Sequence, residues 1–219
     1  MKQKSTQKLQ TATTFINTTQ ELLEQEDFKN VSVRKIADKA GFHNSTIYLY
    51  FKDLDELLML ASMKYFYDYS QALEALSNQS LSPVKTFLSV WDLFFTTMCR
   101  KPQVFYNFFY GRRSSNLKEV MDTYYSIFPE ERNSFSKEIE AMYFGNNFFE
   151  RNLVALEPLI NEDTAITSEN ILMVNDIITS CCKSKMEMIC HNPNTDSAEL
   201  KKKFLEILVY ICQIKTDIL

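Results

Sequence analysis

Glycine and proline are scarce in this chain, with three glycines and five prolines among 219 residues. An all-β fold uses these residues in its many tight turns, so their scarcity argues against such a fold. Apolar residues instead recur at spacings of three and four over long stretches, which is the period of an amphipathic helix. The sequence therefore predicts an all-α protein.

Residue types that carry metal and acid-base chemistry are scarce as well. The chain has two histidines, His43 and His191, and its five cysteines show no paired spacing. Adjacent Cys181 and Cys182 point to different faces of a helix, which argues against a metal clip. No glycine-rich phosphate loop, nucleophile elbow or H-E-x-x-H motif occurs. We therefore expect no metal, no cofactor and no enzymatic activity.

Long apolar runs are also missing. No run approaches the roughly 18 residues that a membrane span needs, and the N-terminus lacks a charged-then-apolar signal. An odd number of cysteines without paired spacing is typical of free thiols in a reducing compartment. These features predict a cytoplasmic protein without a membrane partner.

The net charge of −4 argues by itself against binding to nucleic acid. The distribution of charge along the chain favours nucleic-acid binding by the N-terminal part, because the stretch from Phe28 to Lys52 contains five basic residues and one acidic residue. Residues 53–219 carry 16 basic and 23 acidic groups. Since phosphate contact needs only a local basic surface, the N-terminal part is the candidate for DNA binding.

The segment from Ser32 to Lys52, SVRKIADKAGFHNSTIYLYFK, has the pattern of two short helices, over about 33–40 and 44–50, joined by a tight turn. Ser32 is a predicted N-cap, and Gly41 can take the positive φ that ends the first helix. Ile47 and Phe51, four residues apart, are predicted to face inward. Such a pair of helices suits the major groove of DNA. The residues left to face outward are His43, Asn44, Ser45, Thr46, Tyr48 and Tyr50.

The remaining helices can be placed from caps and apolar spacing. A first helix is expected from about residue 4 to 24, and Asp53 or Asp55 can cap a long helix that continues to about Leu76. Ser82-Pro83 is a strong start signal for the next helix. Further helices are predicted over about 83–100, 102–110, 117–127, 129–143, 147–160, 168–191 and 196–217.

The N-terminal segment resembles the signature of the TetR/AcrR family of bacterial transcriptional regulators. The match covers roughly residues 9–58 and has many elements at fixed spacing. These elements are Ile36-Ala37, Ala40-Gly41, Thr46-Ile47-Tyr48, Tyr50-Phe51, Lys52 and Asp55-Glu56-Leu57. Two departures stand out: His43 and Ser45 replace a small residue and a glycine, and Leu54 replaces a lysine. They predict an unusual operator sequence and the loss of one phosphate contact.

The resemblance implies a homodimer with a three-helix DNA-binding lobe over residues 1–52. Residues 53–219 would then form a larger helical domain for effector binding and dimerisation. In such proteins a small molecule in the second domain shifts the connecting helix. The two recognition helices then no longer fit a palindromic operator.

Individual DNA contacts also follow from the resemblance. Phosphate contacts position the protein, while base contacts specify sequence. The alternatives are that Tyr48 packs in the small core and that His43 merely caps a helix. The expected phosphate contacts are Ser32, Arg34, Tyr48, Tyr50 and Lys52, and the expected base contacts are His43, Asn44, Ser45 and Thr46.

Residues 87–149 are rich in large aromatic side chains. Most of them are core residues by default, yet many large rings can leave irregular space for a ligand. We therefore expect a pocket for a lipophilic or aromatic effector. Its candidate residues are Trp91, Phe94, Phe95, Met98, Phe105, Tyr106, Phe109, Tyr124, Tyr125 and Tyr143.

The last two helices are apolar on more than one side, which predicts a partner. Pairing across a two-fold axis would form a four-helix bundle. The predicted interface residues are Ile171, Val174, Ile178, Leu205, Leu208 and Ile211.

The sequence thus predicts a repressor that binds double-stranded operator DNA as a homodimer and is released by a small effector. The alternative is a TetR-like adaptor or co-activator that acts through protein contacts without reading DNA sequence.

Overall fold

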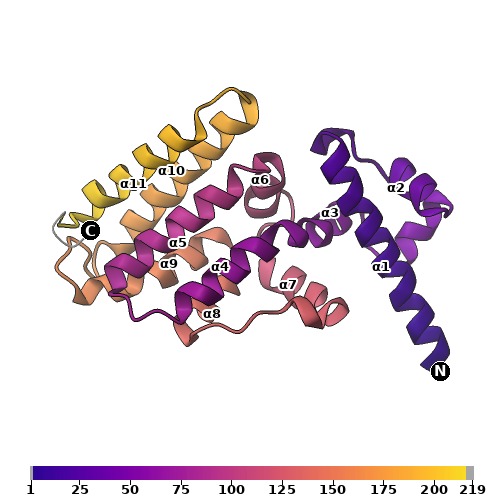
Figure 1. Ribbon diagram of the computed structural model, residues 1–219, viewed down its shortest axis with the longest axis horizontal. Helices are drawn as coiled ribbons and strands as arrows, with labels where there is room; N and C mark the ends of the chain where they lie inside the picture. Colours follow the sequence, from indigo (N-terminus) through magenta and orange to yellow (C-terminus); the bar gives the residue numbers. More distant parts are fainter. Residues whose placement is uncertain (1, 216–219) are drawn as a thin grey trace. The chain divides into compact units, whose positions relative to one another are not determined.

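The computed structural model describes residues 2–215, and this part of the chain contains helices and no strand (Figure 1). The predicted all-α class is confirmed. The chain divides into two compact units. The first unit comprises the described residues up to Lys64 together with Glu119–Arg132, and the second comprises Tyr65–Lys118 and the described residues from Asn133 onward. The predicted division between residues 52 and 53 therefore falls inside the first unit.

The first unit is a small helical core built around α1. Phe15, Ile16, Ile36, Ile47 and Leu57 are fully buried in it, and they come from four different helical segments. Its elements are α1 (Lys2–Gln25), η1 (Phe28–Asn30), α2 (Val33–Ala40), η2 (Asn44–Leu49), α3 (Leu54–Ser62), most of α7 (Leu117–Ile127) and η4 (Pro129–Glu131).

The predicted long helix to Leu76 is wrong, because it is interrupted in the middle. Asp53 caps its start as predicted, but α3 ends at Ser62 and a 3-10 segment, η3 (Met63–Phe66), follows. The helix resumes as α4 (Tyr67–Ser77). Ser62 Oγ donates to the Leu58 carbonyl at 2.6 Å, and such back-bonding by serine bends helices. The interruption contains the residue at which the first unit gives way to the second.

The second unit is larger, and its last two helices, α10 and α11, lie side by side (Figure 1). Helix α10 packs on α6 and α9, and α11 packs on α5. The last residues of the predicted helix 196–217 lie outside the described residues. The elements of this unit are α4, α5 (Pro83–Met98), α6 (Pro102–Tyr110), α8 (Lys137–Tyr143), α9 (Phe148–Leu156), η5 (Glu157–Asn161), α10 (Ile171–His191) and α11 (Ser197–Cys212).

The predicted helix 129–143 is wrong in its first half. After the 3-10 turn η4, the chain is not helical until Ser136, whose side chain accepts the Ile139 N–H at 3.4 Å and caps α8. A serine at this position stabilises a helix start, so α8 begins at Lys137, six residues after η4 ends.

Aromatic rings fill the interior of the second unit. Phe66 stacks on Phe105 with ring centroids 4.5 Å apart, and Phe95 stacks on Phe204 at the same distance. Trp91 lies 4.9 Å from Phe204, which joins α5 to α11. Tight aromatic packing of this kind contributes strongly to a core.

Within residues 2–215, no helix is both long enough and apolar enough to cross a membrane.

Candidate functional site

The start and end of α2 have the predicted geometry. Ser32 caps the helix, accepting the Lys35 N–H at 3.4 Å. At the other end Gly41 has φ 76°, in the left-handed region that favours glycine. The Phe42 N–H returns to the Ala37 carbonyl at 2.9 Å, which completes a Schellman turn. This turn directs the chain into the segment expected to contact DNA.

That segment, η2, is a 3-10 helix rather than the α-helix expected over residues 44–50. The Thr46 N–H donates to the His43 carbonyl at 2.9 Å, and the Tyr50 N–H to the Ile47 carbonyl at 3.0 Å. A run of asparagine, serine, threonine and isoleucine has low α-helix propensity, which favours the tighter form over so short a length. Ile47 and Phe51 are buried, as predicted.

The candidate base-contacting residues lie at the surface. His43, Asn44 and Ser45 are exposed, while Thr46 is half-buried. Tyr48 is 56% exposed, so the alternative that it packs in the small core is wrong.

His43 caps η2, which confirms its capping role. Its Nδ1 accepts the Ser45 N–H at 3.4 Å and lies 2.8 Å from Ser45 Oγ. The ring is nonetheless exposed, so capping holds it at the surface beside Asn44.

The cations expected to contact phosphate are exposed and weakly paired. Arg34 Nε lies 3.6 Å from Asp38 Oδ2, and Lys52 Nζ lies 3.5 Å from Glu119 Oε1 and 3.8 Å from Glu56 Oε1. Exposed ion pairs contribute little free energy in water, so a phosphate can replace these carboxylates at small cost.

Two further lysines of α2 face α1. Lys39 Nζ lies 3.2 Å from Glu21 Oε2, and Lys35 pairs with Glu26. These lysines are therefore paired with carboxylates of the lobe itself. The first unit as a whole carries ten basic and twelve acidic residues, a net charge of −2, so the local excess of positive charge is confined to one stretch of sequence.

The predicted effector residues are divided between the two units. In the second unit Trp91, Phe94, Phe95, Met98, Phe105, Phe109 and Tyr143 are buried, and Tyr106 is partly exposed. Tyr124 and Tyr125 belong instead to the first unit, where the Tyr124 hydroxyl donates to Glu131 at 2.7 Å. This hydrogen bond, together with burial as the larger cause, raises the pKa of Tyr124 well above its ordinary value.

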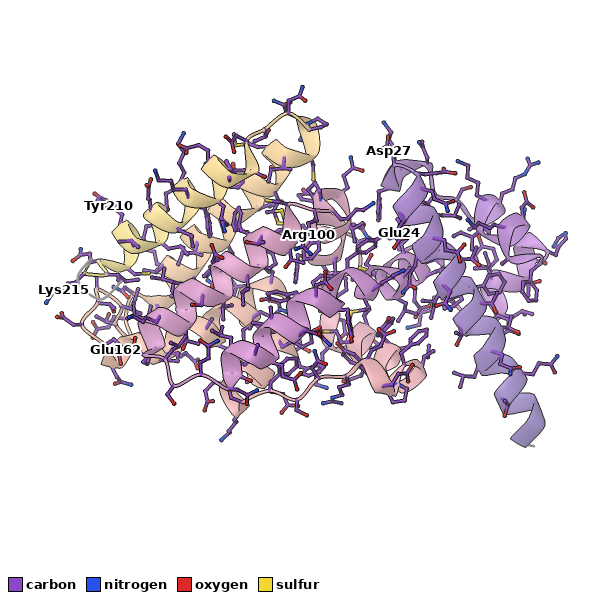
Figure 2. The ribbon with its side chains drawn as sticks, viewed as in Figure 1. Glu24, Asp27, Arg100, Glu162, Tyr210 and Lys215 are labelled. Atoms are coloured by element: carbon purple, nitrogen blue, oxygen red, sulfur yellow. The ribbon has the colours of Figure 1, made fainter. Side chains whose placement is uncertain are left out.

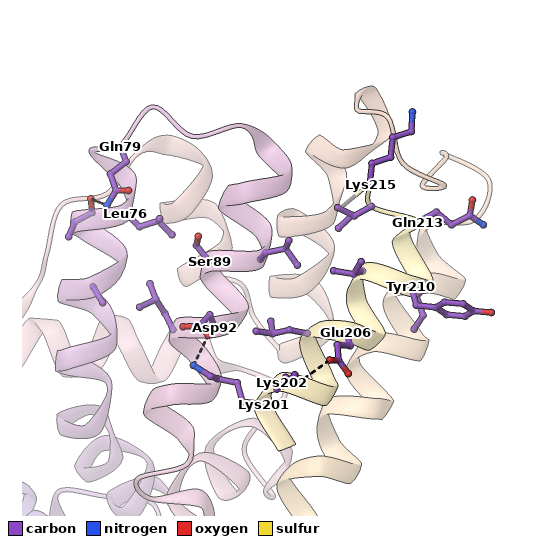
Figure 3. A pocket seen from close by; sticks show the side chains of 18 residues that line it. Leu76, Gln79, Ser89, Asp92, Lys201, Lys202, Glu206, Tyr210, Gln213 and Lys215 are labelled. Atoms are coloured by element: carbon purple, nitrogen blue, oxygen red, sulfur yellow. Dashed lines mark hydrogen bonds and ion pairs between the residues drawn. The ribbon is translucent and has the colours of Figure 1, made fainter. Parts of the chain in front are cut away.

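A large groove of about 1480 Å³ lies at the surface of the second unit, lined by α4, α5 and α11 (Figure 3). An ion pair between Asp92 and Lys201, 2.6 Å apart, lies in it. None of the predicted effector residues lines this groove.

A second cavity, of about 30 Å³, is lined by Trp91 and Phe94 of the predicted set and by Arg151. Sequence reasoning missed Arg151, which is 3% exposed. The available signal was a basic residue between two apolar pairs of the same helix, Phe148-Phe149 and Leu153-Val154.

The predicted dimer residues are largely core residues of the protomer. Ile171, Val174, Ile178 and Leu208 are buried, because these sides of α10 and α11 face the neighbouring helices. They therefore cannot form a surface for a partner, and that prediction is corrected. Leu205 and Ile211 are half-buried.

A different apolar stripe is exposed on the two long helices. Tyr210 is 84% exposed and projects away from α11 (Figures 2 and 3). The exposed apolar residues of α10 are Leu172, Met173, Ile177 and Met188.

Within the described part of the chain, no three histidine, cysteine or acidic side chains gather as metal ligands would.

Residues 15–59 match the family of bacterial regulatory proteins of the tetR family. No curated protein matches this sequence. Among solved structures, the chain resembles FadR of Thermus thermophilus, a TetR-family repressor in complex with lauroyl-CoA. That likeness has a TM-score of 0.60 and 13% identity, covering 93% of this chain and 96% of the other.

Two further structures have the same fold. FadR of Bacillus subtilis, in complex with stearoyl-CoA, is 18% identical with a TM-score of 0.56, over 90% of this chain and 97% of the other. A TetR regulator from Rhodococcus sp. RHA1 is 12% identical with a TM-score of 0.53, over 92% and 94%. The family resemblance is confirmed: this chain carries the helix-turn-helix region of the TetR family and has the fold of TetR-family transcriptional regulators.

Proposed function

We propose that this protein is a cytoplasmic repressor that binds a palindromic DNA operator as a homodimer and is released by a small lipophilic effector. The observation that carries the proposal is the exposed run His43, Asn44 and Ser45 at the start of η2. This run follows the Gly41 turn and lies within the residues that match the tetR family.

The side chains of this run suit base recognition. Asn44 can form a bidentate pair with adenine, and His43 can reach a purine acceptor. Ser45 and Thr46 carry hydroxyls that either donate or accept. The surrounding phosphate contacts are assigned to Ser32, Arg34, Tyr48, Tyr50 and Lys52.

A second copy of the chain is the proposed partner of the exposed apolar stripe on α10 and α11. Burial of Met173, Ile177 and Met188 against the same residues of a partner would be favourable. A two-fold interface repeats the DNA-binding lobe, which is why the operator is expected to be palindromic.

The effector is assigned to the second unit. Its interior is lined by aromatic and methionine side chains, which adapt to lipophilic ligands. The two FadR structures hold acyl-CoA molecules, so long-chain acyl compounds are the first class to test.

One observation favours the alternative of an adaptor that binds protein. Leu49 is 72% exposed and Phe42 is 37% exposed beside the candidate DNA residues, in a unit with net charge −2. Exposed apolar residues in this position would also suit a protein surface.

Selection from random duplex DNA with the purified protein separates the two functions. The repressor proposal predicts a palindromic consensus that binds far more tightly than scrambled DNA, with steep salt dependence. Weak binding without sequence preference would contradict it and support the adaptor. Release of the selected duplex by long-chain acyl compounds then tests the effector.

A further inference from the structure

The two histidines of this chain use the same ring nitrogen for hydrogen bonds of opposite polarity. His43 Nδ1 lies 3.4 Å from the backbone N–H of Ser45, which can only donate. His191 Nδ1 lies 2.7 Å from the Glu187 carbonyl, which can only accept. A neutral imidazole carries one proton, on either Nδ1 or Nε2. The neutral ring of His43 therefore carries its proton on Nε2, whereas the neutral ring of His191 carries it on Nδ1.

The same contact fixes the polarity of the Ser45 hydroxyl. Ser45 Oγ lies 2.8 Å from His43 Nδ1. Because that nitrogen has no proton to give in this tautomer, the hydroxyl donates to it. A serine hydroxyl has one hydrogen and two lone pairs. Since the hydrogen is used on His43, Ser45 Oγ can offer a ligand only its lone pairs and is therefore an acceptor.

The outward side of this residue pair is accessible. His43 and Ser45 are both exposed, and no described residue makes a hydrogen bond with His43 Nε2. Both residues lie within the stretch that matches the tetR family, on either side of exposed Asn44. This part of the surface therefore presents one donor, the Nε2–H of His43, and one acceptor, the Oγ of Ser45.

A donor next to an acceptor complements one base edge in the major groove. Adenine presents the acceptor N7 and the donor N6 amino group on the same edge. Guanine presents two acceptors, N7 and O6, so Ser45 Oγ would face a second set of lone pairs there. Cytosine offers only a donor, and thymine offers an acceptor and a methyl group. Adenine is therefore the one base that satisfies both His43 and Ser45.

We propose that His43 and Ser45 together read one adenine in each operator half-site. His43 Nε2–H donates to N7, and Ser45 Oγ accepts from the N6 amino group. This adenine is distinct from the one assigned to Asn44. The inference deepens the proposed function and rests on its DNA-binding part, because it narrows the purine expected at His43 to adenine.

The first test measures the tautomers of both histidines in the full chain without DNA. It is carried out at about pH 8, where a histidine side chain is ordinarily neutral. Heteronuclear NMR of the ring nitrogens shows which nitrogen carries the proton, and His191→Gln assigns the signals by removing one set. We expect mainly Nε2–H for His43 and mainly Nδ1–H for His191. A neutral His43 protonated mainly on Nδ1 would overturn the inference, whether or not the protein binds DNA.

The second test removes one group of the base at a time from the selected operator. In 7-deazaadenine the N7 acceptor is missing, and in 2-aminopurine the N6 amino group is missing, yet both still pair with thymine. At one adenine of each half-site, each analogue should weaken binding of the wild-type protein about fivefold, the effect of one hydrogen bond. At the adenine assigned to Asn44, by contrast, the effects should be the same in wild type and in variants of His43 and Ser45.

Two variants connect each group of the base to one side chain. His43→Ala should lose the sensitivity to 7-deazaadenine at the shared adenine, because the donor to N7 is already absent. Ser45→Ala should lose the sensitivity to 2-aminopurine. Ser45→Ala keeps the backbone N–H that sets the His43 tautomer, so its sensitivity to 7-deazaadenine should persist.

Ser126→Ala is the matched control, because it removes the hydroxyl of another exposed serine of the first unit, which donates to the Thr123 carbonyl at 2.7 Å. Its affinity for every duplex should stay within about twofold of wild type. A guanine at the position that depends on His43, or the same analogue sensitivities in wild type and both variants, would overturn the inference alone. A wild-type protein without any sequence preference would contradict the proposed function, and the inference with it.

Discussion

The two compact units differ in where their candidate functional residues lie. In the first unit, Tyr48 and Phe42 lie exposed around the candidate DNA-contacting residues. In the second, Phe95, Phe105 and Phe108 are fully buried among helices that come from distant parts of the sequence. The candidate DNA-contacting residues of the first unit therefore lie on a surface made by one short segment. The aromatic residues of the second unit lie in a core to which the whole unit contributes.

This difference explains how each unit can respond to a ligand. The proposed DNA-contacting segment is held by one cap and one turn, so binding to DNA would require no rearrangement of it. A packed core has discrete arrangements, and a ligand that enters it must favour one of them. Asn152, at the small cavity, is hydrogen-bonded to Asn175 of α10, the helix with the exposed apolar stripe. Asn152 therefore links the wall of this cavity to the helix proposed to form the dimer.

The largest expected effect comes from breaking the proposed dimer in the second unit. Ile177→Glu places a charge in the exposed apolar stripe of α10, and desolvating that charge opposes association. We expect monomers by light scattering and a loss of operator affinity of about 100-fold or more, because the two lobes no longer bind together.

The matched control is Gln71→Glu, which adds the same charge on the exposed side of α4. It should leave both mass and affinity unchanged. A variant Ile177→Glu that remains dimeric would contradict the proposed interface.

The next effect concerns charge on the surface of the first unit. Arg34→Ala with Lys52→Ala should weaken binding to operator and scrambled DNA alike, by about tenfold or more at moderate salt. The slope of log affinity against log salt should become shallower by about two, one for each lost phosphate contact. Fluorescence anisotropy across a salt series measures both quantities. An unchanged slope would show that these residues do not contact phosphate.

Gly41 offers a smaller, conformational test of the same surface. Gly41→Ala should lower the free energy of unfolding by about 1–2 kcal/mol, because alanine is disfavoured at φ 76°. No atom lies within 4 Å of the added Cβ, so the cost is that of the backbone alone. Gly41→Asn should cost less, since asparagine tolerates this region. Urea denaturation measures the difference, and equal stability of all three proteins would contradict the turn geometry.

The smallest expected effect is a pH dependence in the second unit. Because burial raises the pKa of Tyr69 to about 12 from 10, the folded state keeps this proton more tightly than the unfolded state. The free energy of unfolding should hold below about pH 10. It should then fall toward pH 12, by at most about 1.4 kcal/mol per pH unit from this group. Tyr69→Phe should make that fall shallower, and an identical slope would contradict the assignment.

Features set by neighbouring residues could be predicted from the sequence. The limits of α2, α6 and α7 agree with the predicted ranges 33–40, 102–110 and 117–127. The caps at Ser32 and Ser82 and the positive φ of Gly41 follow from residue type and position alone. Each depends on interactions within one or two turns of a helix.

Features set by distant contacts could not be predicted. Lys35 and Lys39 belong to the basic stretch of the sequence, yet in the fold they pair with Glu26, which follows α1, and with Glu21 of α1. Helices that are apolar on two sides do not reveal which side is core, so buried Ile178 was assigned to the interface.

The small cavity in the second unit could not be predicted from the sequence for the same reason. Trp91, Met142 and Arg151 come from three different helices, and only packing brings them together. Tyr124 is near the other aromatics in sequence, yet it belongs to the first unit. Residue spacing alone predicts neither the lining of this cavity nor the position of Tyr124 in the first unit.

The most direct test of the central claim is the affinity of Asn44→Ala for selected operator and for scrambled duplex DNA, at one salt concentration. If η2 reads base edges, the variant should lose about 1–3 kcal/mol on the operator and almost nothing on scrambled DNA. Its preference should relax at a single base pair of each half-site. Equal losses on both duplexes, or none on either, would contradict sequence reading by this segment.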